Sequence, residues 1–205
     1  TGLLTARPLL AHCIRADEPD IERIVEAGAG IAHCPKSNAK LGHGRAPFTA
    51  FVNKGARVGL GSDSVASNNV CDMLEEARFA ALLSRAAGDK LSSGERMNAR
   101  EVLFAATTGG ARAIGLDDRT GALAQGLQAD LVVINLDSAH QRPVYDAASA
   151  LVFSSSARDV LLTVVAGREI FRNGRVLTVD EERLGTRMME IQEKLSAAGA
   201  AWSKI

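Results

Sequence analysis

The chain has 205 residues, of which 46% are hydrophobic and 23% are charged. This composition is typical of a soluble globular protein and excludes a disordered or fibrous chain. The 24 lysines and arginines balance the 24 aspartates and glutamates, so no long-range electric field draws the protein toward nucleic acid or an anionic membrane. We therefore expect a small-molecule partner, and neither a nucleic acid nor a membrane.

The cysteines indicate the compartment. Cys13, Cys34 and Cys71 form an odd count without a C-x-x-C pair, which argues against a disulfide framework and against a cysteine zinc site. No run reaches the roughly 18 apolar residues of a membrane-spanning helix, and the first residues lack the basic and apolar regions of an export signal. The sequence thus predicts a reduced, cytoplasmic protein. Its first residue is not methionine, which favours the presence of further residues upstream.

The first part of the chain repeats one pattern, a short apolar run followed by a helix-like segment. Residues 10–13 (LAHC) and 31–34 (IAHC) are the first two such runs. After the first run, Asp17 can cap a helix whose end is marked by Gly28. This segment is a predicted βα unit.

Two more βα units follow. Residues 35–46 predict a long loop, and Pro47 opens a helix that Gly55 closes. The third unit has an apolar strand, a polar loop and a helix rich in Ala, Leu, Met and Glu, at residues 58–61, 62–69 and about 70–87. Consecutive βα units predict a parallel sheet.

The rest of the chain changes in character. Asn98 and Glu101 resemble a capping box, which predicts a helix that ends at Gly115. Asn173-Gly174 predicts a hairpin between 170–172 and 175–177, because this pair adopts the positive φ angles of a type I′ turn. Further β-rich runs are predicted at 129–134, 150–153 and 160–165. From residue 180 an amphipathic helix with a docking face is predicted, with its apolar positions at Leu184, Met188, Ile191 and Leu195.

Three polar side chains end successive predicted strands, namely His12, His33 and Asp63. The carboxyl ends of parallel strands converge on one edge, where α/β barrels build their active sites. A carboxylate beside an apolar strand is costly unless a cation or hydrogen-bond donors compensate its charge. The alternative is structural: a single histidine at a strand end is often a packed core residue, and Asp63 can equally cap a turn near Ser64 or Ser67.

Two longer segments carry a family resemblance. Residues 32–44 (AHCPKSNAKLGHG) and 59–69 (GLGSDSVASNN) resemble the amidohydrolase superfamily, in the branch of methylthioadenosine/S-adenosylhomocysteine deaminases, guanine deaminases and s-triazine hydrolases. Residues 127–134 (LQADLVVI) resemble the return of that branch into its small β domain. The resemblance covers essentially the whole chain.

The resemblance implies an α/β fold, the C-terminal part of a TIM (β/α)8 barrel followed by part of a small composite β domain and a terminal helix. Residues 1–116 would then hold barrel strands six to eight with their helices. Residues 117–179 would form the C-terminal part of the small β domain, and residues 180–205 the terminal helix.

The resemblance also implies roles for individual residues. Asp63 is similar to the aspartate that ligates the metal and carries a proton from the bound water to the leaving nitrogen. His12 is similar to the histidine that hydrogen-bonds the metal-bound water or the developing oxyanion, and His33 would face the substrate pocket. Other residues expected near the substrate are Asn38, Lys40, Ser67, Asn68 and Asn69. The implied cofactor is Zn²⁺ or another divalent metal such as Fe²⁺.

The sequence departs from the family in its histidines. Members of this branch complete the metal site with a His-x-His pair, a further histidine and a nearby glutamate. The four histidines of this chain are His12, His33, His43 and His140, and no two of them stand two apart. A single carboxylate cannot hold a catalytic zinc, which normally has three protein ligands. We therefore expect the remaining ligands to be absent from this chain, which would be the C-terminal part of an enzyme.

The expected function of the parent protein is hydrolytic deamination of an aminated purine or related heterocycle. A divalent metal lowers the pKa of its bound water to about 7, a carboxylate such as Asp63 accepts the proton, and a histidine such as His12 stabilises the developing charge. Two alternatives stay open: a triazine-type C–Cl hydrolase or other C–N hydrolase, and a non-catalytic truncated polypeptide. We also expect the parent to be a homo-oligomer.

Overall fold

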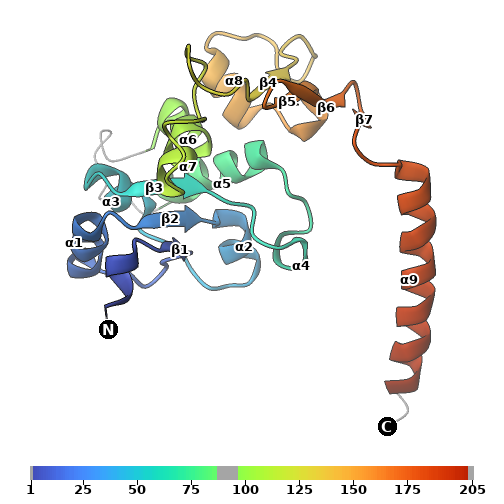
Figure 1. Ribbon diagram of the computed structural model, residues 1–205, viewed down its shortest axis with the longest axis horizontal. Helices are drawn as coiled ribbons and strands as arrows, with labels where there is room; N and C mark the ends of the chain where they lie inside the picture. The colour runs from blue at the N-terminus through green and yellow to red at the C-terminus, as the bar shows by residue number, and fades with distance from the viewer. Residues whose placement is uncertain (1, 87–96, 203–205) are drawn as a thin grey trace.

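A parallel sheet and an antiparallel sheet organise the chain (Figure 1). The computed structural model describes residues 2–86 and 97–202. The parallel sheet has the order β1-β2-β3, with bounds Leu9–Ala11, Gly30–His33 and Arg57–Leu60. The antiparallel sheet has the order β4-β5-β6-β7, with bounds Leu131–Ile134, Val160–Val165, Arg168–Arg172 and Arg175–Val176. The fold is α/β, and the predicted parallel βα units are confirmed.

Helices connect and cover these strands. Their bounds are η1 Leu3–Ala6, α1 Glu18–Ala27, α2 Pro35–Lys40, α3 Phe48–Asn53, α4 Val65–Asn68, α5 Met73–Arg85, α6 Ala99–Ala106, α7 Thr108–Ala113, α8 Ala147–Phe153, η3 Ala157–Asp159 and α9 Glu181–Trp202. The last residue of the helix predicted at about 70–87 lies outside the described residues. Within the described parts of the chain, no helix is both long enough and apolar enough to cross a membrane.

The predicted helix ends are formed by local hydrogen bonds. The Asp17 carboxylate accepts a hydrogen bond from the Asp20 backbone N–H at 2.9 Å, which satisfies a free donor in the first turn of α1. Gly28 ends α1 with a left-handed φ of 65°. The Asn98 and Glu101 side chains each bond to the other's backbone N–H, at 3.0 and 2.7 Å. These predictions are confirmed.

Two predicted loops contain short helices, so those predictions were wrong in part. The segment 35–46 begins with α2, because Pro35 has a fixed φ that suits the first helical position. The polar loop 62–69 contains α4, where the Ser64 hydroxyl caps the helix by accepting from the Ala66 N–H at 3.1 Å. A proline starts the first of these helices and a serine caps the second, so neither segment is wholly open loop.

Two predicted elements differ in kind. The single helix predicted over 98–115 is divided into α6 and α7 at Thr107, whose φ of −126° and ψ of −99° are not helical. The β run predicted at 150–153 is the end of α8, which Asp146 caps by accepting from the Ser149 N–H at 2.8 Å. Periodicity alone cannot separate short apolar runs of helix and strand. The hairpin is confirmed, with positive φ at Asn173 and Gly174.

Helix α7 lies directly on β2 and β3 because glycines remove the side chains between them. A Cβ atom added at Gly59 would lie 2.5 Å from the Cα of Gly110. A Cβ added at Gly30 would lie 2.0 Å from the carbonyl oxygen of Ala113. Backbone contact of this kind requires glycine.

We predict that Gly59→Ala lowers the free energy of unfolding by about 1–3 kcal/mol, because the added methyl group forces α7 away from β3. Urea denaturation measures the change. The matched control is Gly185→Ala in α9, where a Cβ would meet no atom within 4 Å, and alanine favours a helix. Equal stability of Gly59→Ala and the unchanged chain would show that α7 is not held in this contact.

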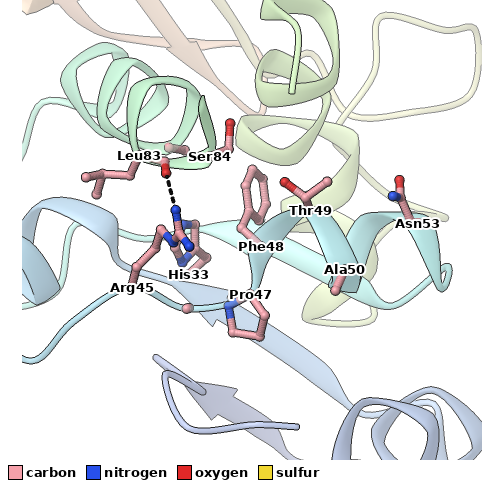
Figure 2. Close-up of a pocket in the computed structure, with 11 residues that line it drawn as sticks. His33, Arg45, Pro47, Phe48, Thr49, Ala50, Asn53, Leu83 and Ser84 are labelled. Carbon is pink, nitrogen blue, oxygen red and sulfur yellow. Dashed lines mark hydrogen bonds between the residues drawn. The ribbon is translucent and has the colours of Figure 1, made fainter. Parts of the chain in front are cut away.

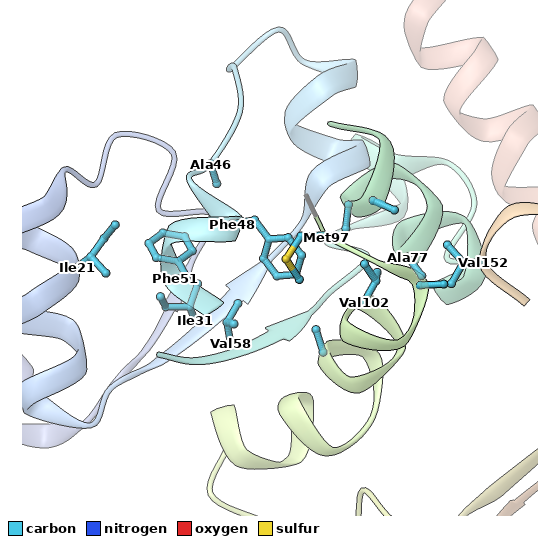
Figure 3. Packing of buried hydrophobic residues seen from close by; sticks show 14 of the residues in the cluster. Ile21, Ile31, Ala46, Phe48, Phe51, Val58, Ala77, Met97, Val102 and Val152 are labelled. Atoms are coloured by element: carbon cyan, nitrogen blue, oxygen red, sulfur yellow. The ribbon is translucent and has the colours of Figure 1, made fainter. Parts of the chain in front are cut away.

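The core lies between the parallel sheet and helices α1, α3, α5, α6 and α8 (Figure 3). Its fully buried side chains include Phe51, Ile31 and Val102. Val152 of α8 is also fully buried in this cluster, and its carbonyl accepts a hydrogen bond from the Arg78 guanidinium at 2.9 Å. Helix α8 therefore packs with the first part of the chain, although it lies between β4 and β5 in sequence.

Helix α9 extends away from the rest of the chain (Figure 1). The helix predicted from residue 180 is present, at Glu181–Trp202. The four apolar positions of its stripe are exposed, with exposed fractions of 50% at Leu184, 57% at Met188, 38% at Ile191 and 67% at Leu195. The docking role of this face stays a prediction.

Candidate active site

The three polar strand ends lie along one edge of the parallel sheet. His12 follows β1, His33 is the last residue of β2, and Asp63 follows β3. His12 and Asp63 have left-handed backbones, with φ of 67° and 58°. Such angles are uncommon outside glycine, and strained residues cluster at functional sites. The carboxyl edge of this sheet is therefore the candidate active site.

Asp63 is held as a carboxylate by hydroxyl groups. Its Oδ2 atom accepts hydrogen bonds from Ser37 Oγ at 2.5 Å and Ser67 Oγ at 2.7 Å. These bonds, with one from the backbone of Ser64, lower the pKa of Asp63 to about 2. The side chain keeps 29% of its surface exposed, so this ionised group is accessible to a substrate.

His12 faces the same carboxylate. Its Nδ1 atom lies 2.8 Å from Oδ1 of Asn38, and because an amide oxygen only accepts, Nδ1 is the donor. Its Nε2 atom lies 3.9 Å from Asp63 Oδ2, which is too long for a hydrogen bond but close enough for a shared ligand atom. Asn38 is only 1% exposed, so the orientation of the imidazole is fixed from the protein interior.

His33 has different surroundings. Its ring is 2% exposed and stacks on Phe48, with centroids 4.6 Å apart. It lines a pocket of about 250 Å³ between α3 and α5, beside Arg45, whose guanidinium donates to the Leu83 carbonyl at 3.2 Å (Figure 2). Neither His12 nor Asp63 lines this pocket. The substrate contact expected of His33 stays a prediction.

His33 gives the folded chain a pH dependence. Burial, and then the nearby His12, lowers the pKa of His33 from 6.5 to about 3. Between these values the unfolded chain binds a proton that the folded chain does not, so stability falls as pH falls from about 6.5. We predict that His33→Gln loses less stability to urea between about pH 7 and pH 5 than the unchanged chain does.

His43→Gln is the control for this measurement, because His43 is exposed and its loss should leave the pH dependence as it is. Identical pH dependence in His33→Gln and the unchanged chain would contradict the buried, neutral state of His33.

The other predicted substrate residues divide into two groups. Asn38 and Ser67 contact His12 and Asp63 directly. Asn68 is 1% exposed and donates to the Ser62 carbonyl at 2.6 Å and to Glu76, not to Asp63. The Lys40 ammonium joins α2 to the loop after β3 through the Ala66 carbonyl and Asn69. Whether any of these residues binds substrate stays a prediction.

Sequence reasoning missed two residues of this region. Ser37 lies inside the segment that carries the family resemblance, and its bond to Asp63 appears only in three dimensions. Glu76 is fully buried on α5. Glu76 stands four residues before the buried Ala80, which places it on the inner face of that helix. The helical periodicity of the sequence could therefore have predicted that Glu76 is buried.

The described residues do not form a complete zinc site. Among residues 2–86 and 97–202, no three His, Cys, Asp or Glu side chains lie together in a way that could hold a metal ion. Asp63 and His12 are a single carboxylate and a single imidazole, and a catalytic zinc normally has three protein ligands. These residues can therefore supply at most part of a metal centre.

Comparison with known proteins places this site in a family. Residues 2–170 match the model of the Amidohydrolase family. The chain is 44% identical over 183 residues to a 5-methylthioadenosine/S-adenosylhomocysteine deaminase of Desulforudis audaxviator, covering 89% of this chain. An adenosine deaminase from Xanthomonas campestris with bound zinc superposes over 96% of the chain, with a TM-score of 0.90 and 31% identity.

A zinc complex of atrazine chlorohydrolase from Arthrobacter aurescens superposes over 92% of the chain, with a TM-score of 0.85 and 32% identity. The chain spans 42% of the length of the Desulforudis protein, 44% of the Xanthomonas chain and 41% of the Arthrobacter chain. The resemblance found in the sequence is confirmed. Since the family model matches most of its residues, the chain belongs to the amidohydrolase family.

Proposed function

We propose that the whole protein containing this chain is a zinc-dependent hydrolytic deaminase of an aminated purine or a related heterocycle. The observation that carries the proposal is the ionised Asp63, held by Ser37 and Ser67 and faced by His12 at the carboxyl edge of the sheet. Support comes from the 44% identity to a deaminase of methylthioadenosine and S-adenosylhomocysteine. Zinc in two similar solved structures supports the choice of metal.

The residues of this chain have defined tasks in that reaction. Zinc, when bound, would be held in part by Asp63 and would supply a water whose pKa is lowered to about 7. Asp63 accepts a proton from the attacking water and returns it to the leaving nitrogen, and the two serines keep its Oδ2 atom in place. His12 presents Nε2 toward the same space and stabilises charge on the oxygen that becomes bonded to the ring carbon.

The proposal includes the architecture of the parent protein. Residues 1–116 would supply strands six to eight of a TIM barrel, residues 117–179 part of a small β domain, and residues 180–205 a terminal helix. The remaining metal ligands would come from residues outside this chain, and the parent would be a homo-oligomer. The cysteine thiols at positions 13, 34 and 71 are free, which supports a reducing, cytoplasmic location.

We expect the whole protein to release ammonia from adenosine, 5′-methylthioadenosine or S-adenosylhomocysteine, measured by a coupled ammonia assay. The 205-residue chain alone should release none and should retain well under one zinc per chain after dialysis, because Asp63 is its single carboxylate ligand. Release of chloride from a chlorotriazine instead would favour a triazine hydrolase, to which the 32% identical chlorohydrolase points. Stoichiometric, tightly held zinc in the chain alone would contradict the ligand assignment.

A further inference from the structure

Glu76 is a buried carboxylate to which the proposed reaction gives no task. It lies on α5 and has an exposed fraction of 0%. Burying a carboxylate is costly unless donors satisfy its oxygens. Both oxygens are satisfied: Oε1 accepts from Asn68 Nδ2, and Oε2 accepts from the Lys36 backbone N–H at 3.2 Å. Burial raises the pKa of Glu76, and these two bonds act in the opposite direction.

The two donors belong to the two segments that hold Asp63. Lys36 directly precedes Ser37, whose hydroxyl donates to Asp63. Asn68 directly follows Ser67, which donates to the same oxygen of Asp63. A single carboxylate therefore fixes the start of α2 and the end of α4, each one residue away from a serine that positions the proposed proton acceptor.

The hydrogen bonds of this network have fixed directions. Nδ2 of Asn68 donates to both the Ser62 carbonyl and Glu76, and Oδ1 of Asn68 accepts from the Val70 N–H at 3.4 Å. The backbone N–H of Lys36 can only donate. A glutamine at position 76 would place an N–H₂ group against one of these donors, whichever way its amide turned. The network therefore requires a carboxylate, not merely a side chain of this size.

Glu75 provides a natural comparison on the same helix. It pairs with the Lys36 ammonium group and is partly exposed. It shares no hydrogen bond with the loop after β3 in the described part of the chain. Removal of its charge therefore tests the effect of a lost carboxylate near α2, while the hydrogen bonds of Glu76 to Lys36 and Asn68 stay in place.

We propose that Glu76 is a positioning residue for the active site, which acts by holding Ser37 and Ser67 in hydrogen-bonding distance of Asp63. The kinetic consequence rests on the proposed function, since it requires Asp63 to be the proton acceptor. The structural link between the two segments is independent of that function.

Hydrogen exchange of the whole protein, followed by mass spectrometry, tests the structural link. Glu76→Gln should accelerate exchange in the peptides covering residues 34–41 and 62–70, and leave α1 (Glu18–Ala27) unchanged. Glu75→Gln should leave 62–70 unchanged. If Glu76→Gln does not fold, Asn68→Ala replaces it and should accelerate exchange in 62–70 alone. Faster exchange throughout the chain would overturn the proposal, because Glu76 would then be a general packing residue. Faster exchange in neither segment would also overturn it, because Glu76 would then hold neither segment in place.

Steady-state kinetics of the whole protein test the consequence for the reaction. Glu76→Gln should lower kcat by about 10- to 100-fold with little change in KM, since a displaced catalytic group slows the reaction more than it weakens binding. Glu75→Gln should keep the kcat of the unchanged enzyme. A kcat unaffected by Glu76→Gln would overturn the positioning role. An unchanged enzyme without deaminase activity would reject the proposed function, and the exchange experiment would still decide the structural link.

Discussion

Asp63→Asn in the whole protein is expected to lower kcat by about 10²- to 10⁴-fold, the usual contribution of general acid–base catalysis. The amide keeps the shape of the carboxylate, and the hydroxyls of Ser37 and Ser67 can still bond to its oxygen. What it loses is the ability to take up a proton from water, together with the negative charge of a metal ligand. Substrate turnover measured at saturating concentration separates this loss from weaker binding.

Asp130→Asn is the matched control for this substitution. The Asp130 carboxylate also accepts two strong hydrogen bonds, from Thr120 Oγ1 at 2.5 Å and from the Ala166 N–H at 2.6 Å. It lies next to β4, away from the parallel sheet. The same chemical change there should leave kcat near that of the unchanged enzyme. Near-normal turnover of Asp63→Asn would refute the role of Asp63.

The second large effect concerns the core. Phe51→Ala is expected to lower the free energy of unfolding by about 3–5 kcal/mol, because it removes a large buried ring and leaves a cavity. Phe51 is 0% exposed and belongs to the cluster that includes Ile21, Ile31 and Val58 (Figure 3). These residues join α1 and α3 to the strands that carry the site. Urea denaturation measures the change.

Phe104→Ala is the control, since the same side chain at that position is 45% exposed and its removal should cost far less. A similar loss from both substitutions would mean that the core is not centred on α3. Phe51→Ala should also disturb the candidate active site, because the segments that follow β2 and β3 depend on the same packing.

Features set by neighbouring residues were predictable from the sequence. Asp17 and Gly28 bound α1 as expected, because a cap bonds to a backbone group only three residues away. Asn173-Gly174 forms its hairpin because both residues tolerate positive φ. In both cases the interactions that form the structure lie within a few residues of each other, so the local sequence is enough to predict it.

Elements that depend on distant partners were predicted less well. The apolar run 150–153 was expected to be a strand and is helix α8, whose Val152 packs against α5 and α6. The helix expected over 98–115 divides at Thr107, where Gly109 and Gly110 allow α7 to lie on β3. In both cases long-range packing selects among conformations that the local sequence allows.

The sequence by itself determined that His12, His33 and Asp63 lie at or just after the ends of parallel strands, because the carboxyl ends of such strands meet at one edge of the sheet. Only the tertiary structure decided what each residue meets there. Asp63 is bonded by serines from two separate segments, His33 turns into a pocket beside Phe48, and one buried carboxylate, Glu76, ties those two segments together. These contacts join residues as far as 40 positions apart, and a local sequence pattern cannot predict contacts between residues so far apart.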